Sequence, residues 1–183
     1  MSSTRFLRFG IVVVAAVLAG AIGFAFAGAG IDAVDEALIE APPAEVYEAL
    51  IAEAAGRTSW WAPYWRAAVR GDGAPDRVGS IMDITVQLPG AKRVVRMVGR
   101  TEEAVPGRLI RIEYIDGDYV GEVVLTLEPE GGGTRVRVRF DTQPTRWTLR
   151  LLSPIVRKGH SAVMRAGFTG LAEHLRRATP AVR

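Results

Sequence analysis

The sequence predicts an α+β fold: a curved antiparallel sheet of about six to seven strands wrapped around a long C-terminal helix. Three observations predict it. Residues 34–141 contain successive stretches in which apolar and polar residues alternate, which is typical of strands with one wet face. Short Gly- and Pro-containing turn signals separate these stretches. Residues 146–177 instead carry apolar residues at helical spacing.

An uncharged apolar stretch, residues 9–31, precedes the predicted domain. About 20 helical residues cross a bilayer core, so this stretch is long enough for a transmembrane anchor. Arg5 and Arg8 lie before it, and every charged residue between it and Arg57 is acidic. The positive-inside rule therefore predicts a short cytoplasmic N-terminus, residues 1–8, and a cell-membrane protein whose domain, residues 32–183, is extracytoplasmic.

A signal peptide is the alternative for the same stretch. Ala25-Phe26-Ala27 has the small residues of a signal-peptidase site. Cleavage after Ala27 would release a secreted or periplasmic domain. The length of the apolar stretch, which exceeds that of an ordinary signal-peptide core, favours the uncleaved anchor.

Residues 34–41 alternate as a strand and end at Pro42-Pro43. Pro43 suits the first turn of a helix, which is expected over residues 44–55 and ends at Gly56. A short helix or turn with most of the tryptophans follows at residues 58–65.

Six further strands are expected, joined by short turns in a meander. The last of them carries Arg135, Arg137 and Arg139 on one face, so that face meets water. Residues 146–177 form the helix that covers the other face, with Ser153 and Pro154 at the start of its main part. The six strands span residues 67–70, 80–88, 93–101, 108–116, 119–128 and 134–141.

Composition excludes several kinds of site. The chain of 183 residues has no cysteine, which excludes disulfides, thiolate metal ligands and cysteine nucleophiles. Residues 146–183 carry eight basic residues and one acidic residue. These charges are spread along the helix among apolar residues, which favours a solvated face over a site for anionic lipid or nucleic acid.

Several short motifs resemble the START-like, or SRPBCC, superfamily, which includes polyketide cyclases/dehydrases and lipid-transfer domains. The motifs are Ile39-Glu-Ala-Pro-Pro-Ala-Glu-Val-Tyr47, Trp60-Trp-Ala-Pro63, Val78-Gly-Ser80, Leu127 to Arg135 and Gly167 to Leu175. The resemblance covers residues 33–177 and implies a helix-grip fold, in which the sheet curls around the last helix and encloses an apolar cavity. Function on one fold diverges widely, so the resemblance alone does not decide the activity.

The expected ligand cavity is lined by inward-facing apolar and aromatic residues. A solid core of the same residues is the alternative, although three of the four methionines fall in the set and methionine adapts to irregular surfaces. The expected lining residues are Trp61, Met82, Ile84, Met97, Ile112, Tyr114, Val123, Phe140, Met164 and Phe168.

No catalytic set, metal site or cofactor site is predicted. His160 and His174 lie about 21 Å apart along a helix and cannot share a metal. A surface or capping role is expected for His160, and a place at the cavity mouth is the alternative. Asp83, Arg96, Arg111 and Glu113 are expected on the outer face of the sheet. A shifted register would instead bring Asp83 or Arg96 inside.

The cluster Trp60, Trp61, Tyr64 and Trp65 has three interpretations: packing onto the sheet, gating a ligand entrance, or contact with the membrane interface. The favoured function is a membrane-tethered, non-catalytic domain that binds a hydrophobic small molecule, with a lipid as one option. The alternative is an enzyme of the cyclase/dehydrase kind that uses the same cavity, with Tyr114 and Arg96 as first candidates. The sequence leaves the oligomeric state open.

Overall fold

The computed structural model describes residues 30–92 and 94–178. The chain begins with strand β1 (Ile31–Ile39) and helix α2 (Pro43–Ala54), and ends with the short helix α3 (Trp147–Leu151) and the long helix α4 (Ser153–Ala178). Between them lie six strands: β2 (Trp65–Val69), β3 (Ile81–Gln87), β4 (Val94–Val105), β5 (Leu109–Gly117), β6 (Tyr119–Glu130) and β7 (Gly133–Pro144).

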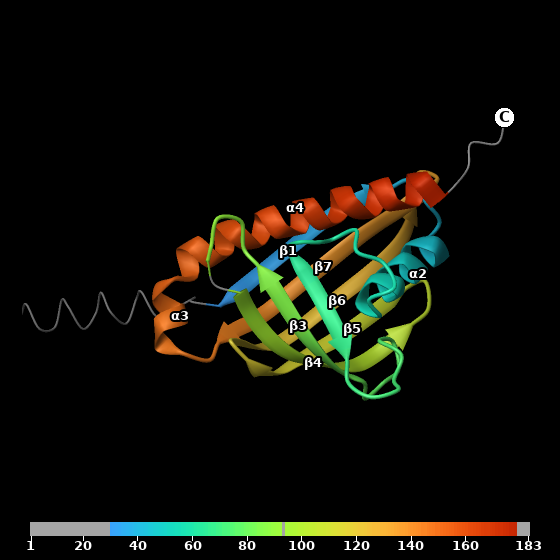
Figure 1. Cartoon of the computed structure of the whole chain (residues 1–183). Helices are drawn as coiled ribbons and strands as arrows, with labels where there is room; N and C mark the ends of the chain where they lie inside the picture. Colours follow the sequence, from blue (N-terminus) through green and yellow to red (C-terminus); the bar gives the residue numbers. More distant parts are fainter. Residues whose placement is uncertain (1–29, 93, 179–183) are drawn as a thin grey trace, which may run out of the picture.

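The seven strands form one antiparallel sheet in the order β1-β7-β6-β5-β4-β3-β2. Strands β2 to β7 are a meander, and β1 closes the sheet beside β7. The sheet is strongly curved, and α4 lies along its open side with α2 at one end (Figure 1). The predicted curved antiparallel sheet around a C-terminal helix is therefore confirmed.

The outer face of the sheet is a network of charged cross-strand pairs. Arg139 on β7 bonds Glu122 on β6 at 2.8 Å, and Arg137 bonds Glu36 on β1 at 3.2 Å. Asp83, Arg111 and Glu113 likewise pair with arginines or glutamates on this face, and Arg96 is exposed there. The shifted register that would turn Asp83 or Arg96 inward does not occur.

Helix α4 turns one apolar stripe toward the sheet, formed by Val156, Val163, Met164, Gly167, Leu171 and Leu175. Two glycines on α4 let the tryptophan turn approach closely. A Cβ atom on Gly167 would lie 2.2 Å from the ring of Trp61, and one on Gly170 would lie 2.3 Å from the carbonyl oxygen of Trp60. Glycine is required where another segment comes this near.

The structure decides two local expectations. Of the helix or turn expected at residues 58–65, a turn forms over residues 58–64, because the carboxylate of Glu53 accepts hydrogen bonds from the backbone N–H groups of Trp60 and Trp61 and so stabilises a bent chain. The main helix begins at Ser153 as expected, and the helical segment before it is the separate helix α3. Pro154 supplies no N–H group for a helical bond at this point.

The predicted transmembrane anchor, residues 9–31, and the residues before it fall almost wholly outside the described part of the chain. Within residues 30–92 and 94–178, no helix has the length and apolar character needed to cross a membrane.

Candidate functional site

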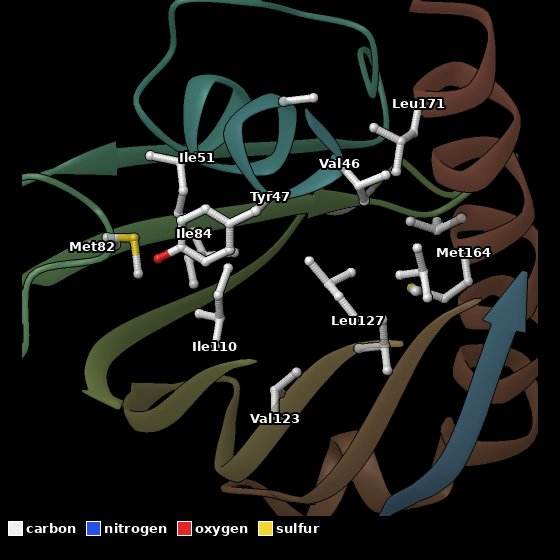
Figure 2. Close-up of a cluster of buried hydrophobic side chains, with 14 of the residues drawn as sticks. Val46, Tyr47, Ile51, Met82, Ile84, Ile110, Val123, Leu127, Met164 and Leu171 are labelled. Atoms are coloured by element: carbon white, nitrogen blue, oxygen red, sulfur yellow. The ribbon is translucent and has the colours of Figure 1, made fainter. Parts of the chain in front are cut away.

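The curved sheet and α4 enclose a cavity of about 160 Å³. Its wall is almost entirely apolar, and it is built from the inward-facing residues of β3 to β7, Ile31 of β1, the second half of α2, the first half of α4 and the tryptophan turn. Figure 2 shows Met82, Ile84, Ile110 and Val123 from the strands facing Met164 of α4 across the interior. Alternation places these strand residues on one face, and the curvature brings that face around the helix.

The structure places nine of the ten residues predicted to line a cavity around this one: Trp61, Met82, Ile84, Met97, Ile112, Tyr114, Val123, Phe140 and Met164. Phe168 is the exception. It is half-buried on α4 and packs against the core without reaching the cavity. Its position on the helix lies between the stripe that faces the sheet and the exposed side, which spacing alone does not resolve.

The cavity occupies only one end of the interior. The other end, below the first half of α2 and the last turns of α4, is filled by residues that do not line it: Ile39, Val46, Tyr47, Leu127, Val136, Leu171 and Leu175. We call this the packed end. The hollow end lies below the first half of α4, where Ile31, Phe140, Val156 and His160 belong to the wall.

The tryptophan turn closes one side of the cavity. Trp61 stacks between Trp60 and Trp65, with ring centroids 5.6 and 5.2 Å away. Its indole Nε1 donates a hydrogen bond to the carbonyl oxygen of Val163 on α4, at 3.0 Å. Of the three interpretations of this cluster, these contacts support packing, and the three rings also form part of the cavity wall.

Polar side chains reach the wall at few points. Tyr114 and Tyr119 are both buried, and burial raises the pKa of each phenol above its usual value. The hydroxyl of Tyr119 is buried and has no hydrogen-bond partner among the described residues. Glu53 also lines the cavity, but its carboxylate already accepts bonds from Thr58, Trp60 and Trp61.

For His160 the structure selects the alternative over the favoured surface or capping role. His160 lines the cavity instead of lying at the surface or capping the helix, and its side chain is only 12% exposed. Its Nε2 atom lies 2.9 Å from Oδ2 of Asp35 on β1, and its ring meets Phe140 edge-on at 4.4 Å. The alternation of β1 could have indicated an inward carboxylate, since Asp35 shares the inward face with Ala37 and Ile39.

The chemistry available at the site follows from these groups. Arg96, a first candidate for an enzyme, is on the outer face and does not reach the cavity. Tyr114 lines it. Among the described residues, no group of three or more potential metal ligands is found. The described geometry therefore offers an apolar chamber with one imidazole–carboxylate pair, two phenols and the side chain of Thr142.

Comparison with known proteins agrees with this architecture. The family described as "Polyketide cyclase / dehydrase and lipid transport" matches residues 31–176. The chain belongs to this family. The resemblance to the SRPBCC superfamily is thus confirmed at the level of the family. None of the curated proteins compared with the chain matches it.

Solved structures show the same fold at low sequence identity. TTHA0849 from Thermus thermophilus is 22% identical, with a TM-score of 0.62, covering 81% of this chain and 99% of that one. CV1439 from Chromobacterium violaceum is 19% identical, with a TM-score of 0.57, covering 77% and 94%. Ms6760 from Mycobacterium smegmatis is 16% identical, with a TM-score of 0.57, covering 80% and 91%.

Proposed function

We propose that this family member binds a small hydrophobic molecule in the cavity between the sheet and α4. The observation that carries the proposal is the hollow end itself. A well-packed domain leaves few voids larger than a water molecule, whereas this domain contains a cavity of about 160 Å³ with an almost entirely apolar wall. The description of the family, which names cyclases, dehydrases and lipid transport, also supports a ligand site.

The size of the chamber limits the ligand. Its volume of about 160 Å³ is close to that of an engineered apolar cavity of about 150 Å³, which stays dry and takes up benzene. Pockets for drug-sized ligands are larger, about 300–1,000 Å³. The favoured ligand is therefore about one ring in size, and a lipid would enter only by one chain end unless the cavity widens.

Toluene uptake by the full-length chain tests this proposal by calorimetry. We expect saturable binding to the wild type and at least a tenfold loss in Val123→Phe, because the larger ring fills the chamber. Val124→Phe is the matched control, since Val124 faces the opposite side of the same strand. Absence of saturable binding, or equal binding by Val123→Phe, would overturn the proposal.

We propose further that residues 9–31 tether the domain to a membrane. The length of the apolar stretch and the basic residues before it support this. At the start of the described chain, the carbonyl oxygen of Gly30 accepts two bonds from the Arg157 guanidinium, near the start of α4. The tether would thus emerge beside α3.

The surface around α3 suits contact with lipid headgroups. Trp147, Leu151 and Ile155 are 65%, 58% and 64% exposed and follow one another at a spacing of four residues. Arg146, Arg150, Arg157 and Lys158 surround them. Exposed tryptophan beside basic residues favours the interface of an anionic membrane.

Alkaline carbonate extraction of membranes that contain the full chain tests the tether. We expect the protein to stay with the membrane, and release would contradict an anchor. Brominated lipids in reconstituted vesicles test the α3 surface. They should quench part of the tryptophan fluorescence in the wild type and less of it in Trp147→Phe.

A cyclase- or dehydrase-type enzyme is the second candidate. The family description and the His160–Asp35 pair at the cavity wall support it, because an imidazole oriented by a carboxylate can move a proton. Turnover of an enolisable polyketide-like ketone, abolished in His160→Phe, would favour the enzyme. Binding without turnover would favour the non-catalytic domain.

A further inference from the structure

The hollow end of the cavity has a polar side, formed by His160 and Tyr119. We propose that this pair is a subsite for the hydroxyl group of a small, otherwise apolar ligand such as a monocyclic phenol. The inference rests on the proposed binding function and deepens it, since it names the chemical class of the ligand.

Asp35 fixes which nitrogen of His160 is available. A carboxylate oxygen only accepts hydrogen bonds, so Nε2, 2.9 Å from Oδ2 of Asp35, carries the proton in this pair. Nδ1 of the neutral ring is then the acceptor that His160 can offer. Phe140 meets the ring edge-on and restricts its rotation. The side chains of His160 and Asp35 are 12% and 19% exposed, so water competes little for these positions.

Tyr119 supplies the complementary group. Its side chain lines the same cavity and is 3% exposed, and its hydroxyl has no partner within the described ranges. A buried hydroxyl without a partner loses its hydrogen bonds to water and gains none, and folded proteins rarely tolerate this without a reason. A ligand atom that bonds this hydroxyl would replace a lost bond.

Strands β6 and β7 carry Tyr119 and the ring that His160 meets, and both Tyr119 and His160 line the same cavity. Tyr119 begins β6 opposite Pro144 at the end of β7, and Phe140, which touches His160, lies on β7 only four residues before Pro144. Tyr119 and His160 therefore both belong to the hollow end, away from the residues below the first half of α2.

A hydroxyl group fits this pair better than other polar groups. It can donate to the imidazole nitrogen and accept from the tyrosine at once. A ketone oxygen would leave the imidazole acceptor unused. A carboxylate would find no counter-charge, because no Arg or Lys lines the cavity within the described chain and Glu53 is already there.

The test compares two probes of the same shape, p-cresol and toluene, which differ by one hydroxyl. Binding to the full-length chain is measured by calorimetry, with Val123→Phe as the background for partition into lipid or detergent. Toluene is the more hydrophobic probe, so an apolar chamber alone would prefer it. We expect p-cresol to bind at least tenfold more tightly than toluene.

Variants assign the preference to the subsite. His160→Phe and Tyr119→Phe should each lower p-cresol affinity at least fivefold and leave toluene affinity within twofold. Asp35→Asn should lower p-cresol affinity as well, because the imidazole loses its orienting partner. His174→Phe and Tyr64→Phe are the matched controls, since neither residue lines the cavity, and both should bind as the wild type does.

The outcomes separate this inference from the proposed function. If toluene binds but p-cresol binds no better, the subsite is wrong and the binding function stands. If the preference survives in both His160→Phe and Tyr119→Phe, the subsite is also wrong. If neither probe binds the wild type, both proposals fail together. Thermal unfolding of each variant identifies a loss of binding that comes from misfolding.

Discussion

The two ends of the interior are built from the same strands and the same helix, yet one is filled and the other is hollow. At the packed end, Val46 and Tyr47 of α2 insert between the sheet and the last turns of α4, where Leu171 is 1% exposed. The second half of α2 borders the cavity instead, through Leu50, Ile51, Glu53 and Ala54. Helix α2 therefore contributes to both ends: its first half fills the packed end, and its second half borders the part that can hold a ligand.

Truncation of core side chains should show the largest difference between the two ends. Leu171→Ala is expected to lower the free energy of unfolding by about 3 kcal/mol, because it opens a void in a filled region. Ile112→Ala at the cavity wall should cost about half as much, since Ile112 already lacks neighbours on one side. Urea denaturation measures both, and equal losses would contradict the division.

Glycines on α4 offer a second contrast. Gly170→Ala should destabilise the protein by about 2 kcal/mol, because its Cβ would lie 2.3 Å from a backbone oxygen, and this overpacking exceeds the gain in helix propensity. Gly159→Ala should change stability by less than about 0.5 kcal/mol. Its Cβ would lie 3.1 Å from the end of the Leu88 side chain, which borders the cavity and can move into it. Thermal unfolding compares the two variants.

Substitution by a larger side chain should be tolerated at the hollow end and not at the packed end. Val123→Phe places a ring in the cavity and should change the free energy of unfolding by less than about 1 kcal/mol. Val136→Phe puts the same ring into the packed end, where Val136 is fully buried, and should cost about 2 kcal/mol. A stable Val136→Phe protein would show that the packed end is not filled.

Alkaline pH should affect the hollow end through its tyrosines. Burial raises the pKa of Tyr114 and Tyr119 in the folded protein, so their contribution is fully present below the unfolded pKa of about 10 and is lost as the pH rises above it. Stability should therefore fall between pH 9 and pH 11. In Tyr114→Phe this fall should be smaller by about 1 kcal/mol. An unchanged pH profile would contradict the buried position of this phenol.

Much of the fold could be predicted because each element has a local signature. Alternation located seven strands, and it also predicted the outward arginines of β7, since side chains of a strand point to opposite faces. The same rule placed seven of the nine cavity residues on the inward face of the sheet. Helical spacing placed Met164 correctly but failed for Phe168, whose position lies at the edge of the buried stripe.

The pairing of His160 with Asp35 could not be predicted from local patterns. Asp35 and His160 lie 125 residues apart, on elements whose contact depends on how far the sheet curls around α4. The alternation of β1 indicated that Asp35 faces inward, but it gave no indication that His160 is its partner. The unpaired hydroxyl of Tyr119 is likewise a property of its surroundings.

The sequence by itself determined the seven strands, the covering helix, the family and the apolar face, because periodicity and turn residues act over a few neighbours along the chain. Only the tertiary structure decided that one end of the interior is hollow and that an imidazole–carboxylate pair borders it. Both depend on where α2 and α4 rest on the curved sheet, and packing between distant segments follows the volumes and contacts of all of them together.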